Sequence, residues 1–411
     1  MKKMNAIVGQ SGGPTAAINA TLAGVIAGAM KSDVIRTLYG ARNGVEGILK
    51  DSVVDLSREF DSEEKLALLK QTPAAALGSC RKKLPKLDDE TGKETYEALF
   101  SFFERYEIGY FFYIGGNDSM DTVAKLSAYA EANGKKGISF IGVPKTIDND
   151  LDGTSHTPGF GSAAKYIAAT VQEILRDTAV YTVKAVTIVE IMGRDAGWLT
   201  ASSALCRKLS DTAPDLVYLP EVTFDMESFF EDIEKAFENR PNLVVCVSEG
   251  IRFTDGHYVG EGSQSGVSDA FGHKYLQGTG KALELAVKER FGCKVRSVEL
   301  SLPQRCAAHI LSLADIEESF GVGMAATELC KDHSGVMVTY VRRDDPYSVS
   351  YEPKDVSKIA NRIRSVPREF INERGNDVTD ACLDYLAPLI EGEYPTVYRG
   401  GLPVHYTIKL T

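Results

Sequence analysis

Short apolar runs alternate along the chain with stretches that favour helix. Such runs span residues 110–114, 138–143, 186–191 and 243–247, and each is followed by a polar or glycine-containing turn. Runs of this kind are typical of strands that are buried on both faces of a sheet. With helical stretches such as 122–132 between them, they predict an α/β fold in which mostly parallel sheets are covered by helices.

The N-terminal segment already contains one such unit, with a strand at 5–8, a turn at 9–15 and an alanine-rich helix at 16–30. Because the turn leaves a strand and opens a helix, its backbone NH groups and the positive end of the helix suit an anion. A tight turn that needs glycine at positive φ explains the same residues, and the sequence alone leaves both interpretations open. The spacing of a P-loop is absent, and residues 159–164, which fit a dinucleotide pattern, follow no predicted strand.

Two loops that leave predicted strands carry the residues of most chemical interest. The loop at 115–119 offers backbone NH groups and a carboxylate, and the loop at 144–150 offers a lysine, a hydroxyl and two carboxylates, Asp148 and Asp150. In open α/β sheets such loops line the ligand crevice. Two carboxylates this close repel each other, and alternation would direct them to the same side of an extended loop. Either they serve as general base and metal holder, or they cap local structure.

Composition and charge narrow the function classes. The 411 residues carry 46 Lys and Arg against 57 Asp and Glu, a net charge of −11, which argues against a nucleic acid or an anionic membrane as partner. None of the seven cysteines forms a CxxC pair and several lie in apolar runs, so we expect reduced thiols in a cytoplasmic protein. The first residues resemble a strand rather than a charged and then apolar signal region, so we expect no signal peptide, and no run approaches the roughly 18 apolar residues of a membrane span.

Seven ordered motifs give the chain a resemblance to a known family. They lie at residues 11–13, 77–81, 115–119, 144–150, 192–194, 248–250, and at Arg296 with 304–305. On these motifs the chain resembles the phosphofructokinase family nearly end to end. The resemblance implies two similar Rossmann-like lobes with the active site in the cleft between them. It also implies magnesium-dependent phosphoryl transfer to the 1-hydroxyl of fructose 6-phosphate, in a homodimer or larger assembly whose active sites are each completed by a neighbouring subunit.

The resemblance implies roles for individual residues. Asp148 resembles the family's general base on the sugar hydroxyl, and Thr146 and Asp150 beside it would place the phosphoryl group and support the metal. The remaining catalytic residues that the resemblance implies are Lys145, Asp118 and Arg194. The substrate-binding residues that it implies are Gly12, Gly13, Arg81, Gly116, Ser119, Ile147, Met192, Gly193, Glu249, Arg296, Gln304 and Arg305.

Within that set, the resemblance separates a sugar side from a donor side. Residues 192–194 and Glu249 resemble the segments that bind the sugar and its hydroxyls. Arg296 and Arg305 resemble members of the clamp on the 6-phosphate, a task that suits a bidentate guanidinium. Arg81 resembles the arginine of the donor-phosphate pocket.

Two positions indicate pyrophosphate rather than ATP as the phosphoryl donor. ATP-using members of the family carry glycine at the positions of Asp118 and Lys145, whereas this chain resembles the pyrophosphate-dependent branch. A carboxylate at Asp118 would repel the α-phosphate of ATP, and Lys145 would add a cation facing pyrophosphate and its leaving phosphate. The sequence thus predicts a reversible pyrophosphate-dependent reaction. An ATP-dependent phosphofructokinase and a noncatalytic regulatory subunit of the same fold are the alternatives.

Three positions depart from the family pattern. Asn117 stands where a metal-site aspartate is expected, so the implied magnesium ligands are Asn117 and Asp150. Ala185 stands where the family has a cross-subunit arginine, with Lys184 beside it as a weak substitute. Leu302 stands where a histidine of the sugar-phosphate clamp is expected.

The expected division into lobes follows the same resemblance. We expect residues 1–160 and about 305–360 to form the donor lobe, and residues 161–304 and about 361–411 to form the sugar lobe. The stretch 255–277, rich in glycine and serine, is expected to be a surface excursion rather than a linker.

Overall fold

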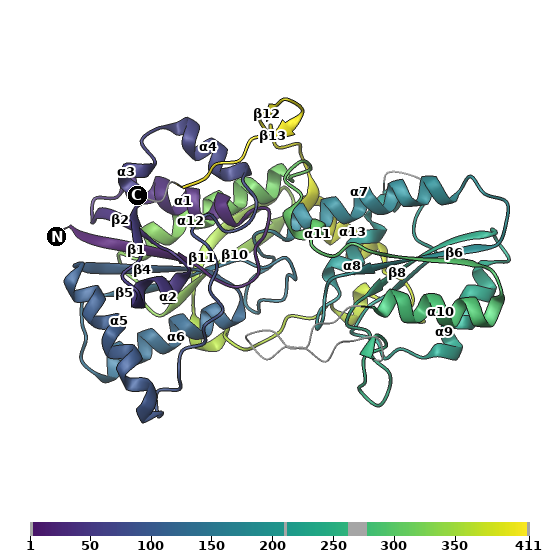
Figure 1. Ribbon diagram of the computed structural model, residues 1–411, viewed down its shortest axis with the longest axis horizontal. Coiled ribbons are helices and arrows are strands. Elements are labelled where there is room, and N and C mark those ends of the chain that lie inside the picture. The colour runs from purple at the N-terminus through teal and green to yellow at the C-terminus, as the bar shows by residue number, and fades with distance from the viewer. Residues whose placement is uncertain (1–2, 209–211, 262–277, 409–411) are drawn as a thin grey trace.

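Two α/β lobes lie side by side in the computed structural model, which describes residues 3–208, 212–261 and 278–408 (Figure 1). Each lobe is built on its own sheet, and helices cover both faces of each sheet. The predicted α/β class with mostly parallel sheets is confirmed.

The first lobe contains a seven-stranded sheet in the order β11-β10-β5-β4-β1-β2-β3. Its strands are β1 (Met4–Gln10), β2 (Ile35–Ala41), β3 (Val53–Asp55), β4 (Ile108–Gly115), β5 (Ser139–Pro144), β10 (Val336–Asp344) and β11 (Tyr347–Asp355). Strands β10, β5, β4, β1 and β2 are parallel, whereas β3 and β11 join the two edges antiparallel.

Alternate residues of each central strand enter different cores, which explains the continuous apolar runs in the sequence. Ala6 and Val8 of β1 pack with α1 (Ile18–Lys31) and α12 (Leu313–Leu329). Ile7 enters the opposite core, with α2 (Gly44–Leu49), α5 (Lys93–Arg105) and α6 (Asn117–Ala132). A strand covered on both sides has no solvent face on which polar residues would alternate.

The second lobe contains a four-stranded parallel sheet in the order β7-β8-β6-β9. Its strands are β6 (Ala185–Ile191), β7 (Leu216–Tyr218), β8 (Asn242–Ser248) and β9 (Lys294–Glu299). One face packs against α7 (Phe160–Thr178), α8 (Trp198–Ser202) and α13 (Asp380–Leu386), and the other against α9 (Met226–Ala236) and α10 (Thr279–Phe291).

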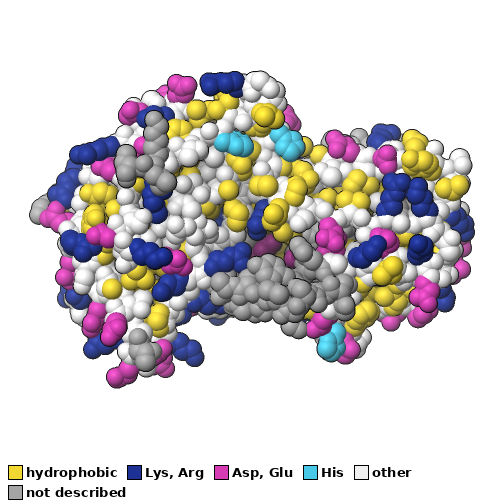
Figure 2. Space-filling view, viewed as in Figure 1, with side chains coloured by type: hydrophobic (Ala, Val, Ile, Leu, Met, Phe, Trp, Pro, Cys, Tyr) yellow, Lys and Arg dark blue, Asp and Glu magenta, His cyan; other side chains and the backbone are white. Residues whose placement is uncertain are grey.

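Shorter elements complete the fold. These are α3 (Leu56–Glu59), α4 (Glu63–Gln71), α11 (Pro303–Cys306), β12 (Tyr398–Arg399), β13 (Leu402–Pro403) and the 3-10 helices η1 (Glu90–Gly92), η2 (Ser203–Lys208), η4 (Val356–Lys358), η5 (Arg368–Phe370) and η6 (Ala387–Ile390). No described helix has the length and apolar character that crossing a bilayer requires. Acidic and basic side chains are interspersed over the face shown in Figure 2.

The described C-terminal residues return to the first lobe. Gln71 of α4 donates to the carbonyl groups of Val397 and Val404, at 3.1 and 2.7 Å, and Ile408 is buried in the core that contains Val8. The sequence assigned this stretch to the sugar lobe, so the predicted limits differ from the packing at this point; the limits otherwise stay a prediction. Most of the predicted excursion, residues 262–277, lies outside the described residues.

One predicted boundary was wrong in a way that affects the site. The sequence placed residues 115–119 in a loop, yet α6 begins at Asn117 with Gly116 as its N-cap. The polar residues of the first helical turn obscured the helix, because Asn, Asp and Ser favour caps and turns as well.

Candidate active site

The carboxyl ends of strands from both sheets meet at one cavity of about 500 Å³. Strands β1, β4 and β5 are neighbours in the first sheet, and β6 and β8 are neighbours in the second. The lining residues are Gly12, Gly13, Pro14, Thr15, Arg81, Lys83, Gly116, Asn117, Asp118, Ser119, Lys145, Thr146, Ile147, Asp148, Asp150, Met192, Arg194, Asp195, Ala196, Glu249, Arg305, Asn361 and Ile363. Because parallel strands end at the same sheet edge, loops far apart in sequence converge here.

The glycine turn after β1 is held by the protein's own backbone. The Ser11 NH donates to the Ile114 carbonyl at 2.9 Å, and the Gly12 NH donates to the Cys80 carbonyl at 3.0 Å. Gly12 has φ of 78°, where a side chain would be strained. The NH groups of Ser11 and Gly12 therefore donate to backbone carbonyls rather than to an anion. This fits the interpretation of the segment as a tight structural turn.

Lys145 lies directly beneath this turn. Its side chain is 2% exposed, and its ammonium donates to the Gly13 carbonyl at 2.7 Å. Burial lowers the pKa of Lys145 to about 8, while the nearby carboxylates of Asp148 and Asp150 act in the opposite direction. The nearby carboxylates and the Gly13 carbonyl oxygen offset part of the free-energy cost of burying the Lys145 ammonium group.

The carboxylate turn, residues 146–150, follows Lys145 and is closed at its base by hydrogen bonds. Thr157 donates its hydroxyl to the Thr146 carbonyl at 2.7 Å, and the Asp148 NH donates to the Thr146 hydroxyl at 3.1 Å. The turn is not extended, because Asn149 between the two carboxylates has φ of 54°, so the alternation expected of an extended loop does not apply to it. Asp148 and Asp150 nevertheless line the same cavity.

Burial raises the pKa of both carboxyl groups in this turn. For Asp148, Lys145 and Arg194 act in the opposite direction to burial. For Asp150, the neighbouring Asp148 adds to burial, and the pKa rises to about 7. A carboxylate with raised proton affinity facing a cavity is suited to accept a proton from a bound alcohol.

The turn between β4 and α6 leads into Asp118, which adds a negatively charged side chain to a cavity that lysine and arginine residues also line. Gly115 packs so closely that an added Cβ would lie 1.9 Å from the Ser119 hydroxyl oxygen. Asp118 forms an ion pair with Lys83 at 3.0 Å, and its side chain keeps 27% of its surface exposed. Asp118 therefore adds a carboxylate to the cavity wall, and Lys83 partly balances the charge of that carboxylate.

Magnesium fits the oxygen atoms on this side of the cavity. The Asn117 side-chain oxygen is buried and, within the described residues, has no hydrogen-bond partner. Asn117 and Asp150 both line the cavity. The described residues contain no cluster of three or more His, Cys, Asp or Glu that could hold a metal alone. Since Mg²⁺ usually keeps waters and phosphate oxygens as ligands, two protein oxygens are enough.

The wall from the second lobe is formed by the loops after β6 and β8. The Met192 NH donates to the Gln304 side chain at 3.2 Å, and the Gly193 NH donates to Glu249 at 3.4 Å. Burial, reinforced by Asp148, raises the pKa of Glu249 to about 8. Gly193 and Gln304 thus support this wall from behind, whereas Met192 and Glu249 face the cavity.

Two arginines converge on the cavity from different elements. Arg305 comes from α11 and Arg81 from the segment after α4. Burial lowers the pKa of the Arg305 guanidinium, and the charge of Arg81 lowers it further. Guanidinium groups that line a cavity can form strong, often bidentate, hydrogen bonds with anionic groups such as phosphates.

Arg296 lies elsewhere. It is exposed on β9, where it lines a separate small depression together with Lys294 and Ala185. Lys184, the weak substitute for the missing arginine, places its ammonium 4.9 Å from the ring centre of Phe237, outside the cavity lining. The structure therefore brings together all predicted site residues except Arg296 as lining residues or their direct supports.

Seven lining residues were not among the predicted site residues. Pro14 and Thr15 belong to the glycine turn at 9–15, and Lys83 follows the motif at 77–81. Asp195 and Ala196 directly follow residues 192–194, so proximity to that motif was an available signal. Asn361 and Ile363 come from an irregular segment after β11, and their sequence pattern carried no signal.

The fold and the cavity are those of a two-lobed phosphotransferase. A family model described as Phosphofructokinase matches residues 5–328, and the chain belongs to this family. The "Pyrophosphate--fructose 6-phosphate 1-phosphotransferase" of Halomonas elongata is 40% identical over 408 residues, 98% of this chain and 96% of that protein. The protein of the same name from Methylococcus capsulatus is 40% identical over 413 residues, 99% of this chain and 96% of that protein.

A solved structure agrees with these relatives. The pyrophosphate-dependent phosphofructokinase from Nitrosospira multiformis superposes with a TM-score of 0.86 at 37% identity, over 99% of this chain and 97% of that one. The predicted family and its pyrophosphate-dependent branch are confirmed by these comparisons. The roles of individual residues stay predictions.

Proposed function

We propose that this protein transfers a phosphoryl group from pyrophosphate to the 1-hydroxyl of fructose 6-phosphate, giving fructose 1,6-bisphosphate and phosphate in a reversible reaction. The observation that carries the proposal is Lys145, a lysine buried beneath the Gly12–Gly13 turn in a cavity that Asp118 also lines. The names of near full-length relatives support the same donor and acceptor.

In the forward direction, the Asp148 carboxylate accepts the proton of the sugar 1-hydroxyl while the oxygen bonds to phosphorus. The bond from that phosphorus to the bridging oxygen of pyrophosphate breaks, and its electron pair leaves with phosphate. Lys145 faces the charge that develops on the leaving group. The raised pKa of Asp148 supports its role as base, and in reverse the protonated carboxyl returns the proton.

Magnesium is the metal that we propose for this site. Asn117 and Asp150 would hold it, the first through its unpartnered oxygen and the second through its carboxylate. When bound, the ion would neutralise phosphate charge and draw down the raised pKa of Asp150.

The second lobe would hold the sugar. Met192, Arg194 and Glu249 line the cavity from the loops after β6 and β8, and Arg305 lines it from α11. We assign Glu249 to the sugar hydroxyls and Arg305 to the 6-phosphate. Since Glu249 has a pKa raised to about 8, it can donate as well as accept a hydrogen bond at neutral pH.

We also propose a homodimer or larger assembly in which Arg296 completes the site of a neighbouring subunit. Support comes from its position, exposed and outside the cavity of its own chain. The two lobes, with the limits expected from the sequence except for the C-terminal stretch, would supply the donor side and the sugar side of each site.

A coupled assay on purified protein tests the proposal directly. Fructose 1,6-bisphosphate formation is measured with pyrophosphate and with ATP at matched free magnesium. We expect activity with pyrophosphate and little with ATP, because Asp118 opposes the α-phosphate of a nucleotide. A preference for ATP would select the ATP-dependent alternative, and inactivity with both donors would select the noncatalytic one.

A further inference from the structure

Arg364 joins the carboxylate turn to two aromatic residues of the other lobe, Trp198 and Tyr385. Its guanidinium donates to the Asn149 carbonyl at 3.2 Å, and its backbone NH donates to the Asp150 carbonyl at 2.8 Å. The same guanidinium lies over the indole of Trp198, 4.2 Å from the ring centre, and donates to the Tyr385 hydroxyl at 2.8 Å. One side chain thus contacts the turn, α8 and α13.

Trp198 in turn begins α8, directly after the loop that forms the second-lobe wall of the cavity. The indole is fully buried, and its NH donates to the Arg364 carbonyl at 3.0 Å. Glu221 reinforces the connection, because its carboxylate accepts from both the Gly197 NH and the Val366 NH at 2.8 Å. Residues 364–366 are therefore fixed to the start of α8 at three points.

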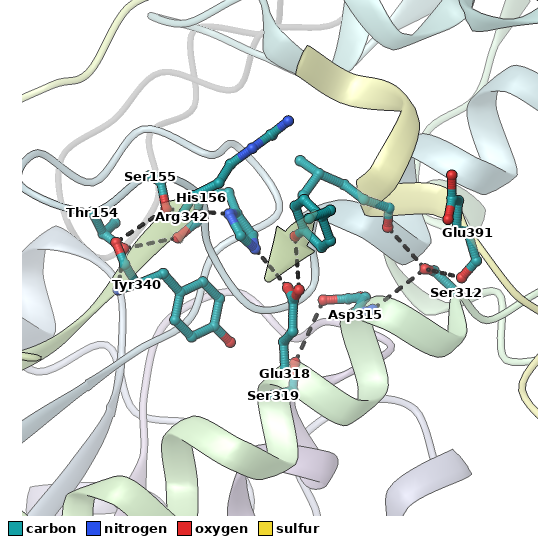
Figure 3. Close-up of polar contacts among 12 residues, drawn as sticks. Thr154, Ser155, His156, Ser312, Asp315, Glu318, Ser319, Tyr340, Arg342 and Glu391 are labelled. Carbon is teal, nitrogen blue, oxygen red and sulfur yellow. Dashed lines mark hydrogen bonds and ion pairs between the residues drawn. The ribbon is translucent and has the colours of Figure 1, made fainter. Parts of the chain in front are cut away.

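The Tyr385 hydroxyl also links Arg364 to Ser155, which lies further along the loop that begins with the carboxylate turn. It donates to the Ser155 carbonyl while accepting from Arg364. Beyond Ser155, the His156 ring and Glu318 of α12 face each other at 2.6 Å, which anchors the loop to the first lobe (Figure 3). Residues 149–156 are thus held at both ends.

We propose that Arg364 is a positioning residue for phosphoryl transfer: it fixes the carboxylate turn of the first lobe relative to the wall that α8 and its preceding loop form in the second. This inference rests on the proposed function, because it assigns the base to one lobe and the sugar to the other. The two reacting groups must be held within a few tenths of an ångström, and a misplacement of about 1 Å can cost roughly 10²-fold in rate.

A set of matched variants tests the inference. Arg364→Met removes the guanidinium contacts, and Arg364→Lys keeps the charge with one donor group. Arg362→Met is the control, because the Arg362 side chain is 65% exposed, forms an ion pair with Asp152 at 3.9 Å and does not line the cavity. Tyr385→Phe removes only the hydroxyl that links Arg364 to Ser155.

We expect kcat to fall about 10- to 100-fold in Arg364→Met, with KM for pyrophosphate changed less than about threefold. Arg364→Lys should recover part of kcat, Tyr385→Phe should lose about three- to tenfold, and Arg362→Met should match the wild type within about twofold. Because Arg364 and Tyr385 act through one connection, the double variant should be no slower than Arg364→Met alone.

Trp198 is the only tryptophan of the chain, so its fluorescence reports on this connection alone. A short-wavelength emission maximum retained in Arg364→Met would show that the indole is still buried and that the kcat loss does not reflect unfolding. If Arg364→Met does not fold, Tyr385→Phe carries the test. Full kcat in the folded variants, or a loss confined to KM, overturns the inference. A wild type inactive with pyrophosphate and with ATP rejects the proposed function instead.

Discussion

The two walls of the cavity differ in how completely one chain builds them. The first-lobe wall combines Lys145, the carboxylate turn and the turn before α6, all at the ends of the neighbouring strands β4 and β5. The second-lobe wall has Glu249, Arg194 and Arg305, but Arg296 faces a separate depression. This difference is what we expect if one chain assembles the groups proposed for chemistry and a neighbouring subunit completes the proposed clamp on the sugar phosphate.

The largest expected effect tests the chemical side. Asp148→Ser should lower kcat by a factor on the order of 10² to 10⁴, the usual worth of a positioned general base. Fructose 6-phosphate binding, measured by calorimetry, should stay nearly intact. Asp152→Ser is a suitable control, since that carboxylate is 45% exposed, lies outside the cavity lining, and contacts Arg362 at 3.9 Å and the Gly153 NH at 2.8 Å. A variant that lost binding but kept kcat would reassign Asp148 to holding the substrate.

Donor selection gives the next effect. Asp118→Gly combined with Lys145→Gly should lower kcat/KM for pyrophosphate by about 10² to 10³, as expected when a preorganised charge is removed. The same change removes the negative group that opposes the α-phosphate of ATP, so ATP binding should improve. The exposed Lys82, outside the cavity lining, provides the control variant Lys82→Gly. Unchanged pyrophosphate use in the double variant would contradict the proposed donor site.

The donor side was also the part that the sequence predicted best, for a physical reason. The apolar runs before residues 115 and 145 mark strands buried on both faces, and the chemistry follows them directly. Sequence spacing could not show that the Lys145 ammonium meets the Gly13 carbonyl of a glycine turn 132 residues earlier. That contact depends on the order of strands in the sheet.

The contacts of Arg364 could not be predicted from the sequence, for a related reason. It lies in an irregular segment, and its partners Asn149, Trp198 and Tyr385 come from three distant parts of the chain. The bend in the carboxylate turn was not predicted. Asn149 adopts a left-handed backbone conformation, and Asn can do so without any characteristic sequence pattern around it. Local pattern predicts elements well, whereas contacts between lobes depend on tertiary packing.

The sugar side is tested by a smaller effect. Arg296→Ala should raise KM for fructose 6-phosphate about 10- to 10²-fold, because a charge-assisted contact to a phosphate dianion is lost. KM for pyrophosphate should be nearly unchanged. Lys294→Ala is the matched control, since Lys294 is exposed on the same strand and lines the same depression.

Subunit mixing decides whether Arg296 acts across an interface. Arg296→Ala protein mixed with Asp148→Ser protein should regain activity after exchange, because one of the two hybrid sites combines an intact Asp148 with an intact Arg296. Full activity in a monomer by ultracentrifugation, or no recovery despite exchange, would place Arg296 in another role and remove the contrast between the two walls.

The smallest expected effect is a change in the free energy of unfolding with pH, which follows from the burial of Lys145. Its pKa is lowered from 10.5 to about 8 in the folded protein, so between these values the unfolded chain binds more protons. The lysine's contribution to stability therefore becomes more favourable as pH rises through this window, by about 1 kcal/mol between pH 8 and 9. Other groups titrate in the same range; the raised pKa values of Cys246 and Cys330 have the opposite effect on stability.

Comparison with Lys145→Met isolates the lysine, because the cysteines and tyrosines are common to both proteins. Urea unfolding at pH 8 and pH 9 should show the wild type gaining stability relative to Lys145→Met by about 1 kcal/mol. An equal pH dependence in the two proteins would mean that Lys145 keeps an ordinary pKa. It would then be better solvated than its 2% exposure suggests, and the first-lobe wall would be less rigidly prepared for a leaving phosphate than its contacts indicate.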